Sequence, residues 1–221
     1  MTLLHLDSSS RTDGSRSPEV AATFRTRWQR EHPSEPMVYR DLAAQPLPHL
    51  VQAVGAAGTP AANRTPAERD ALAVQDEVIE QFLAANAYLL SLPMYNYGVP
   101  SQLKAYLDHL LDGGRVLMVD GSPSPVAGRA ATVVVSFGGG YGPGTPRADF
   151  DFVRPYLTKV LVDSLGLDVE FVAVELTLAP YVPAMAGLVE LGEQSLRDAH
   201  ARAEHLAGPA GDHGRAVPLA S

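Results

Sequence analysis

Short apolar runs with the length of β-strands recur along the whole chain. They lie at residues 2–6, 36–41, 87–92, 130–136 and 169–176. The run at 130–136 is rich in β-branched residues, which is typical of a parallel strand that is buried on both faces. The run at 36–41 is short and has polar flanks, which favours a place at the edge of a sheet.

Segments with a helical period follow these runs. They are expected to begin at Pro18, Pro66 and Ala184, and near Ser101 and Arg154. Ser17 is a suitable N-cap before Pro18, and residues 65–68 form a capping box. Strands that alternate with helices predict a parallel sheet, and hence a single α/β domain over residues 1–207.

Composition excludes several classes of protein. The formal net charge of the 221-residue chain is −8, which argues against a nucleic-acid partner because such a partner needs a basic face. The chain has no cysteine, so disulfides and thiolate chemistry are excluded. No apolar run approaches the roughly 18 residues of a membrane span, and no basic segment precedes the first strand. We therefore expect a cytoplasmic protein without a membrane partner, ending in a disordered tail at 208–221.

Side-chain catalysis has no visible signature in this sequence. There is no HExxH motif and no hydrolase triad pattern, so no catalytic side chain is assigned. The seven histidines do not cluster, since His200 and His205 are five residues apart and point away from a common helical face. We expect the histidines to lie on the surface, and we expect no metal site.

The loop after the first strand is dense in hydroxyl groups. Ser9, Ser15, Arg16 and Ser17 precede or begin the first helix, whose N-terminus offers unpaired N–H groups and a partial positive charge. Neither GxxxxGKS nor GxGxxG is present, so a monophosphate suits this loop better than a triphosphate or a dinucleotide. An ordinary capped helix after a flexible loop is the alternative interpretation.

The loop after the third strand has the composition of a lining for a flat ring. Two prolines, Pro93 and Pro100, stiffen its ends. Between them lie Met94, Tyr95, Asn96 and Tyr97, which provide apolar surface and an amide. Planar ligands bind to apolar faces with a few polar groups at their edges. The alternative is a proline-rich loop whose aromatic rings pack on the core.

The loop after the fourth strand begins with Ser136-Phe137-Gly138-Gly139. Consecutive glycines at a strand end let the backbone approach a ligand closely, although a glycine-rich turn without a ligand is also possible. If the strand order is 2-1-3-4-5, the loops after strands 1, 3 and 4 are neighbours. Ligands of open α/β sheets bind at this carboxyl edge.

These motifs resemble the FMN-dependent NADH:azoreductase family, whose members are flavodoxin-like quinone and azo-compound reductases. The similarity extends from about Leu3 to about Ala203. Its most specific part is residues 93–97, followed by Leu103-Lys104-x-Tyr106-x-Asp108 in the next helix, and Arg40-Asp41-Leu42-Ala43-Ala44 adds to it. Ser9 and Ser15-Arg16-Ser17 match the positions that hold the FMN phosphate in that family.

The resemblance implies a flavodoxin-like three-layer sandwich with a five-stranded parallel sheet in the order 2-1-3-4-5. It further implies FMN as cofactor, NADH or NADPH as co-substrate, azo compounds or quinones as electron acceptors, and a homodimer. The implied cofactor-binding residues are Ser9, Ser15, Arg16, Ser17, Pro93, Met94, Tyr95, Asn96, Tyr97, Ser136, Phe137, Gly138 and Gly139. The flavin would carry the hydride chemistry, while the protein binds and orients it.

Three features separate this chain from the family pattern or leave alternatives open. Phe137 stands where relatives often have arginine, and the aromatic residue usual near Leu117 is missing, which favours a shifted substrate pocket. Residues 48–64 lack a period and either cover the cleft or form a loose insertion. The alternatives to a broad reductase are an enzyme for one quinone or N–N-bonded metabolite, a flavin carrier or sensor, and an α/β module without flavin.

Overall fold

The computed structural model describes residues 1–10, 14–50, 56 and 58–208, and the tail expected at 208–221 lies, apart from its first residue, outside this part. A five-stranded sheet in the order β2-β1-β3-β4-β5 forms the centre, and each neighbouring pair is parallel. The strands are β1 (Leu3–Asp7), β2 (Met37–Asp41), β3 (Ala87–Pro93), β4 (Ala130–Ser136) and β5 (Asp168–Val174). The expected fold class and strand order are confirmed.

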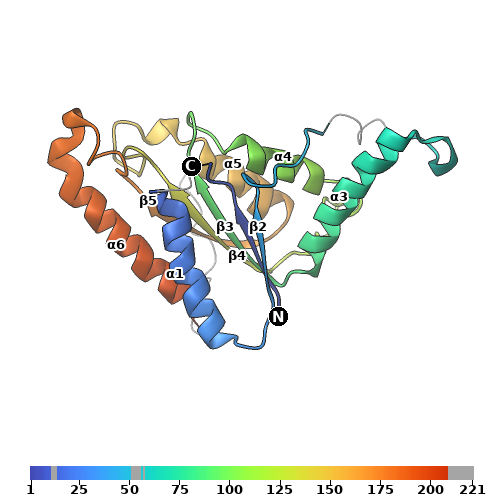
Figure 1. Cartoon of the computed structure of the whole chain (residues 1–221), viewed down its shortest axis with the longest axis horizontal. Coiled ribbons are helices and arrows are strands. Elements are labelled where there is room, and N and C mark those ends of the chain that lie inside the picture. The colour runs from blue at the N-terminus through green and yellow to red at the C-terminus, as the bar shows by residue number, and fades with distance from the viewer. Residues whose placement is uncertain (11–13, 51–55, 57, 209–221) are drawn as a thin grey trace.

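Helices cover both faces of the sheet and complete a three-layer sandwich (Figure 1). The helices are α1 (Arg16–Glu31), α3 (Pro66–Ala84), α4 (Ser101–Leu110), α5 (Val153–Leu157) and α6 (Val189–Leu206). Helices α1 and α6 pack on one face, and α3, α4 and α5 on the other. Short irregular helices are η1 (Ala61–Asn63), η2 (Ala148–Phe150), η3 (Thr158–Ser164) and η4 (Pro183–Leu188).

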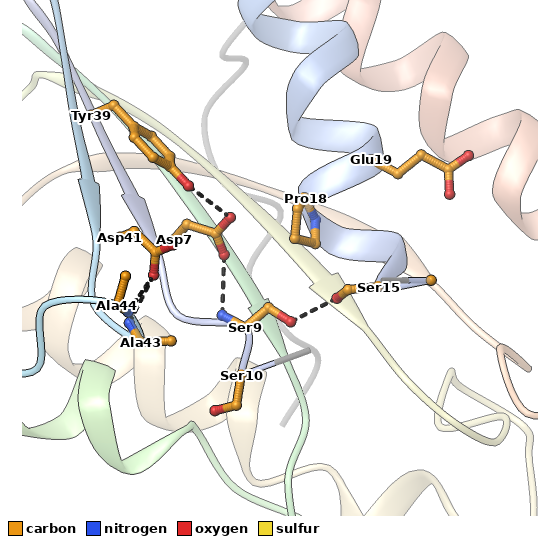
Figure 2. A pocket seen from close by; sticks show the side chains of 11 residues that line it. Asp7, Ser9, Ser10, Ser15, Pro18, Glu19, Tyr39, Asp41, Ala43 and Ala44 are labelled. Carbon is orange, nitrogen blue, oxygen red and sulfur yellow. Dashed lines mark hydrogen bonds between the residues drawn. The ribbon is translucent and has the colours of Figure 1, made fainter. Parts of the chain in front are cut away.

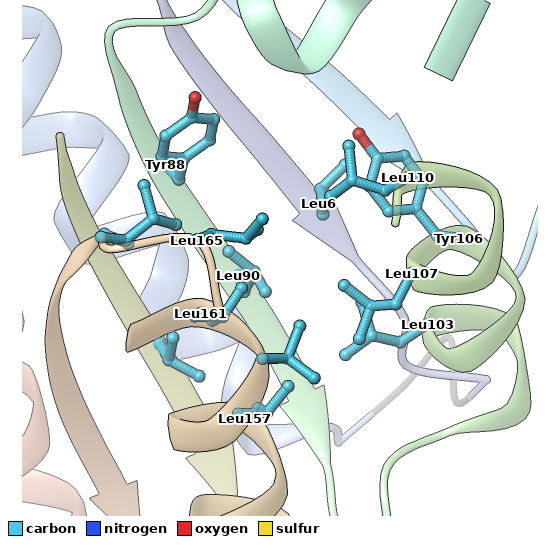
Figure 3. Close-up of a cluster of buried hydrophobic side chains, with 14 of the residues drawn as sticks. Leu6, Tyr88, Leu90, Leu103, Tyr106, Leu107, Leu110, Leu157, Leu161 and Leu165 are labelled. Atoms are coloured by element: carbon cyan, nitrogen blue, oxygen red, sulfur yellow. The ribbon is translucent and has the colours of Figure 1, made fainter. Parts of the chain in front are cut away.

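The alternation of side chains along the strands produces two separate cores. Leu6 and Leu90 point to the α3–α4–α5 face, where they meet Leu107 and Leu161 (Figure 3). Leu3 of β1, Leu89 of β3 and Val134 of β4 point to the other face and pack against α1 and α6. Each fully buried leucine contributes about 1.5–3 kcal/mol through the removal of apolar surface from water. The sheet is thus held from both sides, and its strand ends are free to carry loops.

Helix starts differ from the sequence predictions at two places. Ser15, not Ser17, stands at the N-cap position of α1, and Ser17 is buried within the first turn. The hydroxyl of Ser136 donates to Ser17 Oγ over 3.4 Å, so Ser17 contacts β4. The N-cap prediction for Ser17 is therefore wrong. The last helix also begins later than Ala184, because residues 183–188 form η4.

The capping box at 65–68 is confirmed at the start of α3. The Thr65 hydroxyl accepts the N–H of Glu68 at 3.2 Å, and the Glu68 carboxylate accepts the Thr65 N–H at 2.7 Å. A feature without a sequence signal follows α5, where residues 158–164 continue as a π-helix. Leu157 and Leu161, on either side of this change in helix type, are both buried.

Two histidines contradict the expectation that this residue type lies on the surface. His5 and His109 are both buried. Burial, together with the charge of Arg25, lowers the pKa of His5 to about 3, so this ring is neutral. The His109 ring nitrogen Nε2 lies 2.9 Å from the Pro48 carbonyl oxygen and ties the start of the 48–64 segment to α4.

The structure bears on the metal and membrane expectations only for the residues that it describes. There, no group of three or more potential ligand side chains is placed to hold a metal ion. In the same ranges, no helix combines the length and the apolar character needed to cross a bilayer. Most of residues 51–57 lie outside these ranges, so the choice between a cover over the cleft and a loose insertion at 48–64 stays untested.

Candidate functional site

Loops from four neighbouring strands line one cleft at the carboxyl edge of the sheet. The cleft has a volume of about 190 Å³. Its lining comes from the segments after β1, β3, β4 and β5 and comprises Gly14, Ser15, Arg16, Pro93, Met94, Tyr95, Ser136, Gly138, Thr177, Leu178 and Tyr181. The structure thus brings together the three loops that the sequence singled out and adds a fourth.

One end of the cleft is the N-terminus of α1. Ser15 and Arg16 lie there, and Ser9 Oγ is 2.8 Å from Ser15 Oγ. Hydroxyl groups, a guanidinium and the unpaired N–H groups of the first helical turn favour a negatively charged group. Arg16 also forms an ion pair with Glu19, at 2.8 Å. This end of the cleft therefore has the donor chemistry of an anion site.

The loop after β3 is a tight turn with two strained residues. Tyr95 and Gly98 exchange backbone hydrogen bonds, each 3.0 Å long. Between them, Asn96 and Tyr97 have φ angles of 49° and 70°, a region that non-glycine residues rarely adopt. This turn exposes Asn96 and Tyr97 at its tip, while Met94 and Tyr95 line the cleft.

The loop after β3 is tied to the loops on either side of it. The Met94 N–H donates to the Ser136 carbonyl at 2.9 Å, which joins it to the end of β4. The Tyr95 hydroxyl accepts the N–H of Ser10 at 3.2 Å, which joins it to the loop after β1. Gln102 of α4 reaches the Ser10 hydroxyl at 3.2 Å. These bonds fix the loops relative to one another.

Phe137 is not among the described residues that line the cleft. Its side chain is fully buried, and the guanidinium of Arg154 lies 5.1 Å from the centre of its ring. The strand alternation explains this, because Phe137 continues the inward positions of Val133 and Val135. Its backbone N–H donates to the Val174 carbonyl at 2.8 Å. Phe137 thus packs beneath the loop.

The remaining expected site residues occupy different places. Ser15, Arg16, Pro93, Met94, Tyr95, Ser136 and Gly138 line the cleft. Ser9 supports it through Ser15, and Ser17 is buried behind it against Ser136. Gly139 is outside the lining, where an added Cβ would be 3.3 Å from the Tyr141 ring.

The loop after β5 forms a wall that the sequence analysis missed. The backbone N–H groups of Leu176, Thr177 and Leu178 donate to the carbonyls of Gly139, Phe137 and Gly138, at 3.1, 3.0 and 3.1 Å. Leu176 has a φ of 61°, which turns the chain over the glycines. The available signal was topological, because β5 is the neighbour of β4 in the expected order and its loop must lie beside the glycine loop.

A second, larger cavity adjoins the cleft and shares Gly14 and Ser15 with it. It has a volume of about 670 Å³ and lies between α1 and the ends of β1 and β2 (Figure 2). Its other lining residues are Asp7, Ser9, Ser10, Pro18, Glu19, Tyr39, Asp41, Ala43 and Ala44. The cavity is therefore acidic and hydroxylated, in contrast to the cleft, where Arg16 is the charged residue among the described lining.

The fold and the position of the cleft define a class of protein. Residues 1–190 match a protein family described as having a flavodoxin-like fold. A solved azoreductase, AzrA, superposes with a TM-score of 0.80 over 94% of this chain and 99% of its own, at 20% identity. An FMN-dependent NADH-azoreductase from Bacillus anthracis, solved in complex with FMN, gives 0.79 over 94% and 100%, at 22% identity. The chain belongs to the flavodoxin-like family.

Closer relatives specify the branch of this family. An FMN-dependent NADH:quinone oxidoreductase of Streptomyces avermitilis is 45% identical over 212 residues, which cover 93% of this chain and 97% of the relative. A protein of the same name from Streptomyces coelicolor is 46% identical over 204 residues, 91% of each chain. The chain is therefore a member of the FMN-dependent NADH:quinone oxidoreductase family. The resemblance noted from the sequence motifs is confirmed.

The contact between the glycine loop and the β5 loop yields a first prediction. A methyl group added at Gly138 would lie 2.7 Å from Leu178 Cδ1, so Gly138→Ala should destabilise the fold by ~1 kcal/mol in urea unfolding. Leu178→Ala should restore most of this loss in the double variant, because it removes the clashing atoms. Gly187→Ala, which meets nothing within 4 Å, is the matched control. If the double variant loses as much unfolding free energy as the two single variants together, direct contact between these residues is refuted.

Proposed function

We propose that this protein is an FMN-dependent oxidoreductase that passes two electrons from NADH to quinones or azo compounds. The observation that carries the proposal is the single cleft formed by the loops after β1, β3, β4 and β5, with an anion site at one end and apolar surface at the other. Kinship to the FMN-dependent NADH:quinone oxidoreductases supports the same activity.

The donor set of the cleft fits the two ends of FMN. Ser15 and Arg16 suit a phosphate monoester, because neutral hydroxyls and one guanidinium match a group of low charge. Met94 and Tyr95 on one side and Leu178 on the other offer apolar surface to a planar ring system. Bound FMN supplies the hydride chemistry that no side chain in the cleft can perform.

The residues of the chain position the cofactor and shape its surroundings. Arg16 and Ser15 hold the phosphate, and the first turn of α1 adds its N–H groups. We infer that the Asn96 amide, at the exposed tip of the strained turn, holds the polar edge of the ring. The bonds of Met94 to Ser136 and of Tyr95 to Ser10 hold the loop after β3 in place and so fix this wall of the cleft.

The cleft would receive both substrates in turn once the cofactor is held by the loops that line it. NADH binds first and leaves as the oxidised nucleotide, and the quinone or azo compound then occupies the same space. No carboxylate or imidazole is among the described residues that line the cleft, where Arg16 is the charged side chain. Shape and apolar contact therefore decide which acceptors bind.

The cofactor prediction is tested by the visible spectrum. Purified protein mixed with FMN should quench the flavin fluorescence, and NADH added without oxygen should bleach the flavin absorption. A quinone should then restore it, because the two electrons leave by the same route. A protein that binds FMN but is bleached by dithionite and not by NADH would be a carrier, and one that binds no FMN would be a flavin-free module.

The phosphate prediction rests on Arg16. Arg16→Gln should weaken FMN binding by roughly 10- to 100-fold, since a charge-assisted hydrogen bond contributes about 1.5–3 kcal/mol. The affinity for riboflavin, which lacks the phosphate, should not change. Arg27→Gln is the matched control, because Arg27 makes a comparable pair with Glu31, at 2.8 Å, near the other end of α1. Equal losses for FMN and riboflavin would contradict the assignment.

We also propose that a second copy of the chain covers the open side of the cleft. Four aromatic residues near it expose large fractions of their surface: Tyr97 44%, Phe150 48%, Phe152 59% and Tyr181 68%. Tyr97 and Phe150 contact each other, with ring centres 5.5 Å apart. Grouped exposed aromatic surface is typical of protein interfaces.

The dimer prediction is tested at Phe152. Phe152→Asp should convert the protein from dimers to monomers in light scattering, because a charge at an apolar interface is costly to bury. Phe152→Leu, which keeps the apolar character, should remain dimeric. A wild-type protein that is monomeric at all concentrations used would contradict this proposal.

A further inference from the structure

Asp7 is a buried carboxylate directly behind the loop that we assign to the phosphate. It is the last residue of β1, and 7% of its surface is exposed. Its Oδ1 accepts the N–H of Ser9 at 3.1 Å, and its Oδ2 accepts the hydroxyl of Tyr39 at 3.4 Å (Figure 2). The proposed mechanism gives this residue no role.

The bond from Asp7 reaches the anion site through one intermediate residue. Ser9 receives its main-chain orientation from the Asp7 carboxylate, and its hydroxyl lies 2.8 Å from that of Ser15 at the N-terminus of α1. The Ser9 N–H, which points to Asp7, is thereby directed away from the cleft. Asp7 thus fixes both the shape of the loop and the direction of one of its donors.

The charges that face Asp7 come from three elements. Asp41 of β2 lies directly opposite in the strand register, and Tyr39 of the same strand donates to Asp7. Glu19 and Arg16 of α1 border the same cavity or the adjoining cleft and are paired with each other. Among the residues that the structure describes, the other titratable groups nearby are Arg25 of α1, above the Tyr39 ring, and His5 of β1, beside it.

The proposed function puts a phosphate at Ser15, and Ser15 also lines the cavity that Asp7 lines. A carboxylate close to a phosphate disfavours the ionised form of either group, and a proton on the carboxylate removes the repulsion. A proton on Asp7 also supplies a donor without disturbing the acceptor oxygen that holds Ser9, because a carboxylic acid retains one carbonyl oxygen.

We propose that Asp7 is a positioning residue of the phosphate loop and that proton uptake on its carboxylate strengthens the binding of a phosphate monoester there. The proposal rests on the proposed FMN site and adds a pH-dependent control of cofactor retention to it. It acts through Ser9 and through charge, not through contact with the reacting ring.

The surroundings of Asp7 favour this proton uptake. Burial is the largest cause that raises the pKa of Asp7, and the charge of Asp41 adds to it, while hydrogen bonds from Ser9, Ser91 and Tyr39 oppose the shift. A bound phosphate raises the pKa further. By linkage, FMN affinity must then fall as pH rises through the pKa of Asp7 in the free protein.

The experiment compares FMN and riboflavin affinities, by fluorescence quenching, between about pH 4.5 and about pH 8. The second proton of the FMN phosphate titrates near pH ~6 in every variant, so differences between proteins isolate Asp7. Asp7→Asn keeps an oxygen for Ser9. If the phosphate shifts the Asp7 pKa by about one unit, this variant should bind FMN about tenfold more tightly than wild type at the highest pH of the series. The two proteins should converge at the lower end.

Two further variants keep the test decisive. Asp41→Asn removes an equal charge from the same cavity without touching Ser9, so it should keep a wild-type pH dependence with a lower midpoint. Tyr39→Phe removes a hydrogen bond that opposes the shift, so it should move the midpoint upward with Asp7 in place. Riboflavin affinity should be independent of pH in all four proteins.

Parallel FMN curves for wild type and Asp7→Asn would overturn the inference while leaving the FMN site intact. Equal weakening of FMN and riboflavin in Asp7→Asn would also overturn it, since that result marks a purely structural residue. If the folded wild type binds neither ligand at any pH, the proposed function itself fails, and the inference fails with it.

Discussion

The parallel register of the sheet is the constraint on which the rest of the molecule depends. In β1, β3 and β4 the residues pair without a break, so that Asp7 stands beside Ser91 and Pro93 beside Ser136. Because all strands run the same way, their carboxyl ends share one edge, and loops far apart in sequence become neighbours. The hydrophobic pattern sets this register, since a slip of one residue would turn every apolar side chain to the wrong face.

Much of the fold could be predicted because it follows from periodicity. Strand 130–136 and the capping box at 65–68 were located to the residue. The start of α1 was missed because proline is tolerated anywhere in a first turn, so Pro18 did not fix the N-cap. His5 was misjudged because its burial depends on contacts with β3 and with the Tyr39 ring, which composition cannot reveal.

The site was predictable in outline for a similar reason. Loop composition identified the segments after β1, β3 and β4, but not which of their side chains face the cleft. Phe137 shows the limit, since it belongs to a glycine loop by sequence and to the core by strand alternation. Leu178 and Tyr181 were missed because an apolar loop after an edge strand has no distinctive signal. Asp7 was missed for two reasons. A single polar residue at a strand end has no distinctive signal, and its role depends on contacts with the neighbouring loop.

The most direct test of this account is a crystal structure of the protein with FMN. We predict the phosphate against Ser15 and Arg16, and the ring between Met94 and Tyr95 on one side and Gly138 and Leu178 on the other, without rearrangement of the sheet. A flavin bound elsewhere, or a phosphate in the acidic cavity beside Asp41, would contradict the central claim that the carboxyl edge of the sheet forms one cofactor site.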